Sequence, residues 1–83
     1  MKVTVKYFAG IREAIGTGSE QRDTVAATLG QLRDELIAQG GEHAEALARG
    51  KSVRLALNQT MCDESTVLSE GAEVAFFPPV TGG

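Results

Sequence analysis

The sequence predicts an α+β domain in which a mixed sheet of about five strands packs against one main helix. Val3, Val5 and Tyr7 alternate with polar residues at the start of the chain, which is the period of a half-buried strand. A capped amphipathic segment begins at Thr28, and further strand-like runs follow it. The order is therefore a hairpin, a helix and then more strands. One helix laid across one face of a mixed sheet buries the apolar side of both.

Length and composition narrow the class of protein. The 83 residues suit one small domain, so we expect a single domain over 1–83 with an extended C-terminal tail at 78–83. The formal net charge of −3 disfavours a nucleic-acid binder, which needs a basic surface. Cys62 has no partner for an internal disulfide, and no metal site is expected. No apolar run approaches the ~20 residues of a membrane span. We expect a cytoplasmic protein that binds no membrane.

The first half of the chain contains a predicted hairpin and the clearest helix. The stretch 10–19 carries a glycine-rich turn at 16–19, which leads to a second strand over 20–26. Thr28 and Gln31 then form a capping box, in which the Thr28 hydroxyl accepts an N–H bond three residues on. The apolar side chains behind the cap recur with helical spacing: Leu29, Leu32, Leu36 and Ile37. Two glycines at 40–41 end this helix, and a shorter helix is expected over 42–49.

The second half of the chain contains the remaining strands. They are predicted over 53–57, briefly near 61–62, and over 73–77. Pro78 and Pro79 end the last strand, because neither ring nitrogen can donate to a ladder. Strand parity and the helical stripe together predict the core: Val3, Val5, Tyr7, Leu29, Leu32, Leu36, Val53, Leu55, Leu57, Val74 and Phe76.

Side-chain catalysis has no candidate constellation. The sequence lacks a phosphate-binding loop, a dinucleotide-binding motif and a cluster of metal ligands. His43 lies among Glu and Ala residues and is interpreted as a solvated surface residue. Cys62 has no identifiable base and is interpreted as a small, partly buried hydrophobe. The chain is therefore expected to have no side-chain active site of its own and no bound cofactor.

The C-terminal tail is the remaining candidate for chemistry. Pro78 and Pro79 give it a stiff, extended start, while Gly82 and Gly83 have no side chain to block a narrow channel. A free α-carboxylate is anionic at pH 7 and resists nucleophiles, so it needs activation, such as an acyl-adenylate made from ATP. The activated carbonyl can accept a sulfur, giving a thiocarboxylate, or an amine, giving an amide. Either chemistry makes the protein a carrier whose partners supply the active sites.

Adjacent aromatic residues predict a docking surface. Neighbouring strand residues point to opposite faces, so Phe77 cannot follow Phe76 into the core. By the same argument Phe8, which directly follows Tyr7, points to the face opposite the one that Val3, Val5 and Tyr7 share. We therefore expect Phe8, Ala75 and Phe77 to form an exposed apolar patch that docks a partner.

Several stretches carry a resemblance to a known family. They are Asn58-Gln59-Thr60, Leu68-Ser69-Glu70-Gly71-Ala72-Glu73-Val74 and above all the ending Phe76-Phe77-Pro78-Pro79-Val80-Thr81-Gly82-Gly83. The opening Tyr7-Phe8-Ala9-Gly10-Ile11-Arg12-Glu13 is also similar. Taken together, the chain resembles the small subunit of molybdopterin synthase essentially from end to end.

The resemblance implies a β-grasp, ubiquitin-like fold and a sulfur carrier subunit in molybdenum cofactor biosynthesis. A ubiquitin-activating-type enzyme would adenylate Gly83 with ATP, and a donor such as a cysteine desulfurase or rhodanese would supply sulfur for the thiocarboxylate. The large synthase subunit would use that sulfur to build the dithiolene from cyclic pyranopterin monophosphate. By position, Val80, Thr81 and Gly82 would insert into the large subunit, and Phe77 would lie in the subunit interface.

Other roles remain open at the level of the sequence. A sulfur carrier for thiazole synthesis shares the fold, although such carriers are usually shorter and do not typically end in Phe-Phe-Pro-Pro. A ubiquitin-like protein modifier would end in an isopeptide bond to a substrate lysine. A plain binding module would have an incidental tail.

Overall fold

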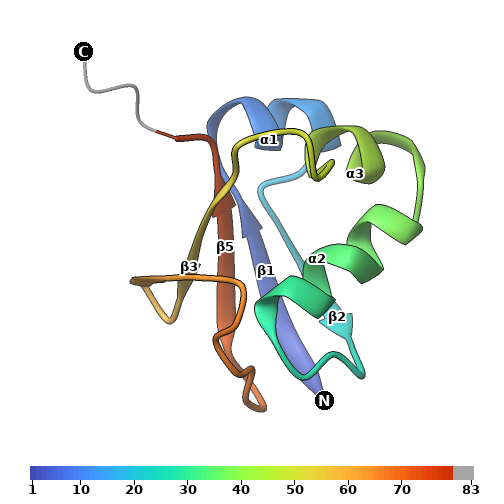
Figure 1. Ribbon diagram of the computed structural model, residues 1–83. Helices are drawn as coiled ribbons and strands as arrows, with labels where there is room; N and C mark the ends of the chain where they lie inside the picture. Colours follow the sequence, from blue (N-terminus) through green and yellow to red (C-terminus); the bar gives the residue numbers. More distant parts are fainter. Residues whose placement is uncertain (80–83) are drawn as a thin grey trace.

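A computed structural model describes residues 1–79 as a single sheet with its helices on one face and at one end (Figure 1). The elements run in the order β1 (Lys2–Tyr7), α1 (Ala9–Ile15), β2 (Ser19–Asp23), α2 (Leu29–Ala38), α3 (Gly41–Ala46), β3 (Arg54–Leu57), β4 (Thr60–Cys62) and β5 (Glu73–Phe77). The predicted mixed sheet packed on a main helix is confirmed.

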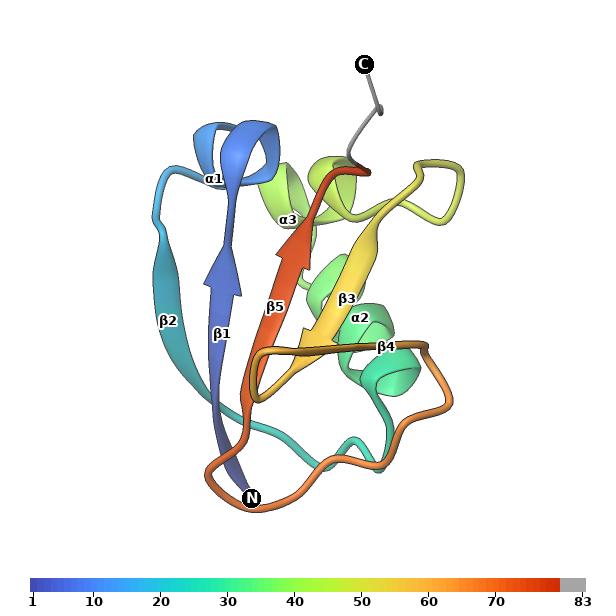
Figure 2. The same ribbon diagram turned by 90° about the vertical axis from the view of Figure 1, so that its left-hand side faces the viewer.

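The sheet places the last strand at its centre. Its order is β2-β1-β5-β3-β4, which Figure 2 shows face on. β1 and β5 are parallel, with Val5 opposite Val74 and Tyr7 opposite Phe76, while the other neighbouring pairs are antiparallel. Because β1 and β5 run in the same direction, their carboxyl ends meet at one end of the sheet. The tail therefore leaves from the middle of the sheet, beside the start of α1.

The core lies between the sheet and the helices. Tyr7 and Phe76 are 1% and 0% exposed, and their rings stack with centroids 6.2 Å apart. The predicted core residues are buried, except that Val53 and Leu57 are only partly buried at its margin. The core also includes residues that periodicity did not predict: Ile11, Ala26, Ala46, Leu47, Leu68 and Ala72.

The main helix begins where the capping box predicts. The Thr28 hydroxyl accepts a hydrogen bond from the Gln31 N–H at 3.2 Å. The Gln31 side chain reaches back to the N–H of Ala27, at 2.8 Å, one residue earlier than a standard capping box. Both bonds satisfy backbone donors that the first helical turn leaves without partners. Gly40, with a φ of 82°, then separates α2 from the shorter α3.

The glycine-rich turn predicted at 16–19 lies between α1 and the start of β2, but the helix before it, α1, was not predicted. Ile11 is buried and Ile15 packs against the core, which gives this short helix one apolar side. Gly16 ends it in the left-handed region, at a φ of 93°, and its N–H donates to the Arg12 carbonyl at 2.8 Å. The second strand is also shorter than predicted. It stops at Asp23 because the Thr24 hydroxyl accepts the N–H of Ala26 at 3.0 Å and turns the chain.

Candidate functional site

The candidate site is the carboxyl end of β5, where the tail begins. Phe77 is the last residue of β5 and pairs with Arg54 of β3, and Pro78 and Pro79 follow directly. A central strand bonded on both sides gives the tail a fixed starting point and direction. The residues predicted to carry or insert the reactive group are Val80, Thr81, Gly82 and Gly83, and these lie outside the described residues.

Phe8 and Phe77 lie side by side at this end of the sheet. The Phe77 side chain is partly buried on the face opposite Phe76, as strand parity predicts. Phe8 caps the start of α1 and is 46% exposed. The two rings meet edge to face, with centroids 6.2 Å apart and planes at 88°. None of the helices within residues 1–79 covers this face of the sheet (Figure 2), so the aromatic pair is a good anchor for a partner.

Ala75 does not contribute exposed surface, contrary to the predicted patch. It is only 7% exposed although it lies on the outer face of the sheet. Its register partners there are Lys6 on β1 and Ala56 on β3. A one-carbon side chain on a central strand is covered by the longer side chains around it. Ala75 therefore forms the floor of the outer face, with Ala56, which is 6% exposed.

Met61 belongs to the same face and was not predicted from the sequence. It pairs in register with Ala56, so it lies on the far side of the alanine floor from Lys6. Its side chain is 54% exposed. We call Phe8, Phe77 and Met61, with the Ala56 and Ala75 floor, the outer patch. Its signal in the sequence is weak, because β4 is short and an exposed Met in a loop region is common.

Polar groups rim the outer patch. Lys6 and Glu73 bridge β1 and β5 across it, with 3.5 Å between Nζ and Oε1. Arg54 lies opposite Phe77 and forms no ion pair with any residue between 1 and 79. An apolar centre with charged neighbours is the usual composition of a protein interface.

His43 is not a solvated surface residue, contrary to expectation. Its side chain is 14% exposed, and its Nε2 lies 2.9 Å from a Glu20 carboxylate oxygen. Its ring meets Tyr7 edge to face, with centroids 5.9 Å apart. Burial, and then the nearby Glu20 charge, raise the pKa of the Tyr7 phenol well above its ordinary value. Sequence reasoning missed this cluster because it joins β1, β2 and α3.

The described part of the chain offers no metal site, no membrane-spanning helix and one free cysteine. Residues 1–79 hold no group of three or more His, Cys, Asp or Glu side chains placed to bind a metal ion. Cys62 is a free thiol that packs partly against the core, as expected. None of the helices that the structure describes combines the length and apolar character that crossing a bilayer requires.

Comparison with known proteins identifies the family. A family model described as the ThiS family matches residues 5–83. The chain belongs to this family. A molybdopterin synthase sulfur carrier subunit of Escherichia coli is 42% identical over 81 residues, with 98% of this chain and 99% of the relative covered. The resemblance to molybdopterin synthase small subunits is thereby confirmed.

Solved structures of the same fold support the assignment. Small archaeal modifier protein 1 of Haloferax volcanii has a TM-score of 0.78 and 27% identity, and both chains are covered completely. A complex of subunits 1 and 2 of the molybdopterin-converting factor from Helicobacter pylori contains a chain with a TM-score of 0.70 and 28% identity, again with complete coverage of both. The β-grasp, ubiquitin-like fold implied by the resemblance is confirmed.

Proposed function

We propose that this member of the family is the sulfur carrier subunit of a molybdopterin synthase, acting in the cytoplasm, and that Gly83 carries the sulfur. The observation that carries the proposal is the position of β5. The central strand of the sheet runs directly into the sequence Pro78-Pro79-Val80-Thr81-Gly82-Gly83. The folded domain thus fixes where the tail starts, next to Phe77 of the outer patch, and a partner can bind the domain while the chain end enters an active site.

The proposed chemistry takes place on the Gly83 carboxylate. A ubiquitin-activating-type enzyme joins this carboxylate to the phosphorus of ATP that becomes AMP, and pyrophosphate leaves. A persulfide made by a donor such as a cysteine desulfurase or rhodanese then attacks the acyl carbon, and AMP leaves. A thiol reduces the resulting acyl disulfide, which leaves the thiocarboxylate. Within the large subunit, sulfur passes to cyclic pyranopterin monophosphate, and water restores the carboxylate oxygen.

The outer patch is proposed to dock the large subunit. Phe77 and Phe8 lie next to the tail, so burial of their rings on association fixes where the tail enters the partner. The likeness to a chain in the Helicobacter pylori complex of subunits 1 and 2 supports a two-subunit assembly. Sulfur transfer would then depend on side chains of the partner.

Mass spectrometry of the protein purified from cells tests the proposal. A sulfur carrier shows a C-terminal fragment whose mass reflects one oxygen replaced by sulfur. A covalent adduct on lysines of other proteins would instead support a protein modifier, the role named for the similar archaeal protein. The same thiocarboxylate on a chain that restores thiazole synthesis, and not molybdopterin synthesis, would identify the thiamine pathway.

Deletion of Gly83 supplies a second test. Activity in a molybdopterin-forming assay should be abolished, because no other carboxylate lies at the same place along the tail. The melting temperature should stay nearly the same, with a stability change of no more than about 0.5 kcal/mol, since a terminal glycine has no side chain to add to the core. Activity retained after the deletion would refute a sulfur carrier that acts through Gly83.

A further inference from the structure

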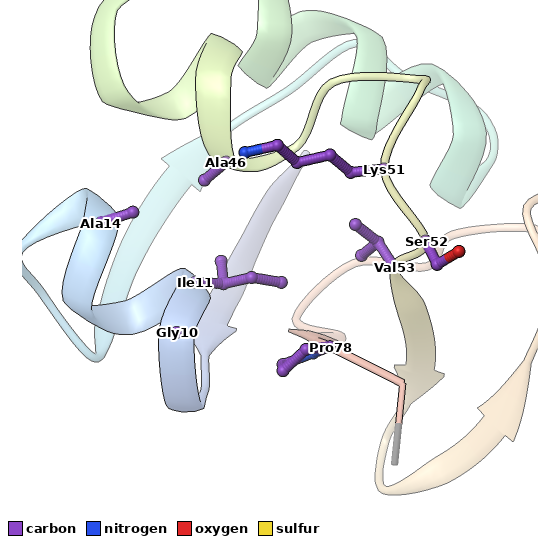
Figure 3. A pocket seen from close by; sticks show the side chains of 8 residues that line it. All are labelled: Gly10, Ile11, Ala14, Ala46, Lys51, Ser52, Val53 and Pro78. Atoms are coloured by element: carbon purple, nitrogen blue, oxygen red, sulfur yellow. The ribbon is translucent and has the colours of Figure 1, made fainter. Parts of the chain in front are cut away.

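A cavity of about 170 Å³ opens beside the root of the tail, on the side of β5 away from the outer patch. It lies between α1, α3 and the segment that enters β3, and Pro78 closes its lower side (Figure 3). Its lining is mostly apolar: Gly10, Ile11, Ala14, Ala46, Lys51, Ser52, Val53 and Pro78. Apolar cavities of about 150 Å³ hold a benzene-sized group. We call this cavity the root pocket.

The wall of the root pocket that carries Lys51 is held by a buried arginine. Arg33 of α2 is 4% exposed, and its guanidinium donates to three backbone carbonyls in the segment between α3 and β3. The N–H···O distances are 2.8 Å to Leu47, 2.8 Å to Ala48 and 3.2 Å to Lys51. These bonds fix the backbone of an otherwise irregular segment. The root pocket is therefore preformed, which lowers the cost of filling it.

Lys51 brings a positive charge to the rim. In Figure 3 its side chain runs along the edge of the pocket towards Ala46. Its ammonium group forms no ion pair with any residue between 1 and 79, although the protein has a net charge of −3. An apolar hollow with one unpaired cation at its edge is complementary to an aliphatic side chain that has a carboxylate next to it.

The length of the tail brings the partner close to this pocket. Six residues follow Phe77, the last residue of β5, so the Gly83 carboxylate reaches at most about 22 Å from the sheet and about 14 Å from Pro79. A partner whose active site binds that carboxylate must lie against Pro78 and Pro79, the residues at which the tail begins. Pro78 itself lines the root pocket, so such a partner covers the pocket or its rim.

We propose that the root pocket receives an aliphatic side chain of the molybdopterin synthase large subunit, and that a carboxylate beside that side chain pairs with Lys51. This inference rests on the proposed function and adds a second anchor to it. The outer patch holds one side of the tail and the root pocket holds the other. Two contact sites on opposite sides of the tail fix the orientation of the carrier on its partner, and so fix the direction in which the tail enters the partner.

Titration calorimetry against the purified large subunit tests the proposal with two variants. Ala14→Leu fills the pocket from an exposed position of α1, and Lys51→Glu reverses the charge on the rim. Each should weaken binding at least tenfold, and the loss caused by Lys51→Glu should shrink as salt is raised, because salt screens exposed charges. Thermal melts of the free variants should match the unmodified chain.

Matched controls separate pocket filling from general effects. Ala38→Leu makes the same change at an exposed position of α2 outside the pocket, and Lys2→Glu reverses a charge at the start of β1, the opposite end of that strand from the tail. Both controls should bind within twofold of the unmodified chain. If Ala14→Leu binds as tightly as Ala38→Leu, the root pocket is not an anchor and the inference is overturned.

Other outcomes identify other occupants and also overturn the proposal. A free chain that sediments as a dimer, and becomes a monomer with Ala14→Leu, would place a second copy in the pocket. If deletion of residues 80–83 lowers the melting temperature and Ala14→Leu tightens partner binding, the chain's own tail fills it. If the unmodified chain does not bind the large subunit at all, the proposed function itself fails.

Discussion

Phe76 and Phe77 show how one step along a strand separates folding from docking. Phe76 is fully buried and stacks on Tyr7, while Phe77 lies on the outer face against Phe8. Strand parity predicted this division, because successive side chains point to opposite faces. Parity did not predict the burial of Ala75, since exposure also depends on the size of the neighbouring side chains. A pattern in the sequence identifies the face, and packing decides how much of it is exposed.

Alanine substitutions at these two positions should therefore have different effects. Phe76→Ala should lower the free energy of unfolding by about 3–5 kcal/mol, because it leaves a cavity in the core. Phe77→Ala should barely change the melting temperature of the free domain. It should weaken binding to the large subunit by about 2 kcal/mol, roughly thirtyfold. Melts and titration calorimetry on both variants check this. Equal destabilisation by the two changes would contradict the outward position of Phe77.

The elements differ in how far the sequence alone predicts them. α2 has a capping residue and a helical apolar stripe, and β5 has a compact apolar run ended by two prolines, so both were predicted well. α1 was missed because its apolar side consists mainly of Ile11 and Ile15, and Gly10 lowers its helix propensity. The spacing of the two isoleucines and the glycine at 16 were the available signals.

β2 has no apolar alternation of its own, and its sequence is Ser-Glu-Gln-Arg-Asp. The strand exists because β1 supplies an antiparallel partner, with Val3 opposite Arg22 and Val5 opposite Glu20. Such an edge strand is defined by hydrogen bonds to a distant segment and by polar side chains that remain in water. The glycine-rich turn before β2 therefore predicted that a second strand exists, but the local sequence did not predict how long this strand is.

The link between α2 and the segment after α3 depends on Arg33. Arg33→Met should lower the free energy of unfolding by about 3 kcal/mol or more. It leaves the carbonyls of Leu47, Ala48 and Lys51 without this donor and removes one of the two arginine partners of Glu64. Arg54→Met is the matched control, because Arg54 is exposed and forms no ion pair within residues 1–79. Urea denaturation of both variants measures the difference. A loss no larger than that of the control would mean that Arg33 is not needed to hold the segment.

At the scale of the whole molecule, the site is assembled from both ends of the chain. The β1–β5 pairing brings Phe8 next to Phe77, and the root pocket joins residues from α1, α3, the β3 approach and Pro78. Sequence reasoning predicted the aromatic pair and the end of the last strand before the two prolines, because each carries a local signal. It did not find the root pocket or the arginine network, since these exist only once distant elements are packed together.

The same network predicts how the stability of the domain depends on pH. Hydrogen bonds from Arg49 and then Arg33 hold the pKa of Glu64 below its usual value of 4.5. Above pH 4.5 the Glu64 carboxyl is ionised in both the folded and the unfolded chain, so its full contribution to the free energy of unfolding is present at such pH values. As pH falls through 4.5 the unfolded chain takes up a proton first, which favours unfolding until the folded group is also protonated.

The free energy of unfolding should therefore lose the contribution of Glu64 as pH falls below about 4.5, with the loss complete below its folded pKa. Glu64→Gln should remove part of this acid-induced fall, by an amount on the order of 1 kcal/mol or less, because the side chain is 36% exposed and water screens the pairing. Glu42→Gln is the control, since Glu42 is exposed and makes no ion pair within residues 1–79. Urea denaturation at a series of pH values compares the slopes. If Glu64→Gln and Glu42→Gln give the same acid profile, the link between α2 and the segment before β5 does not depend on the charge of Glu64.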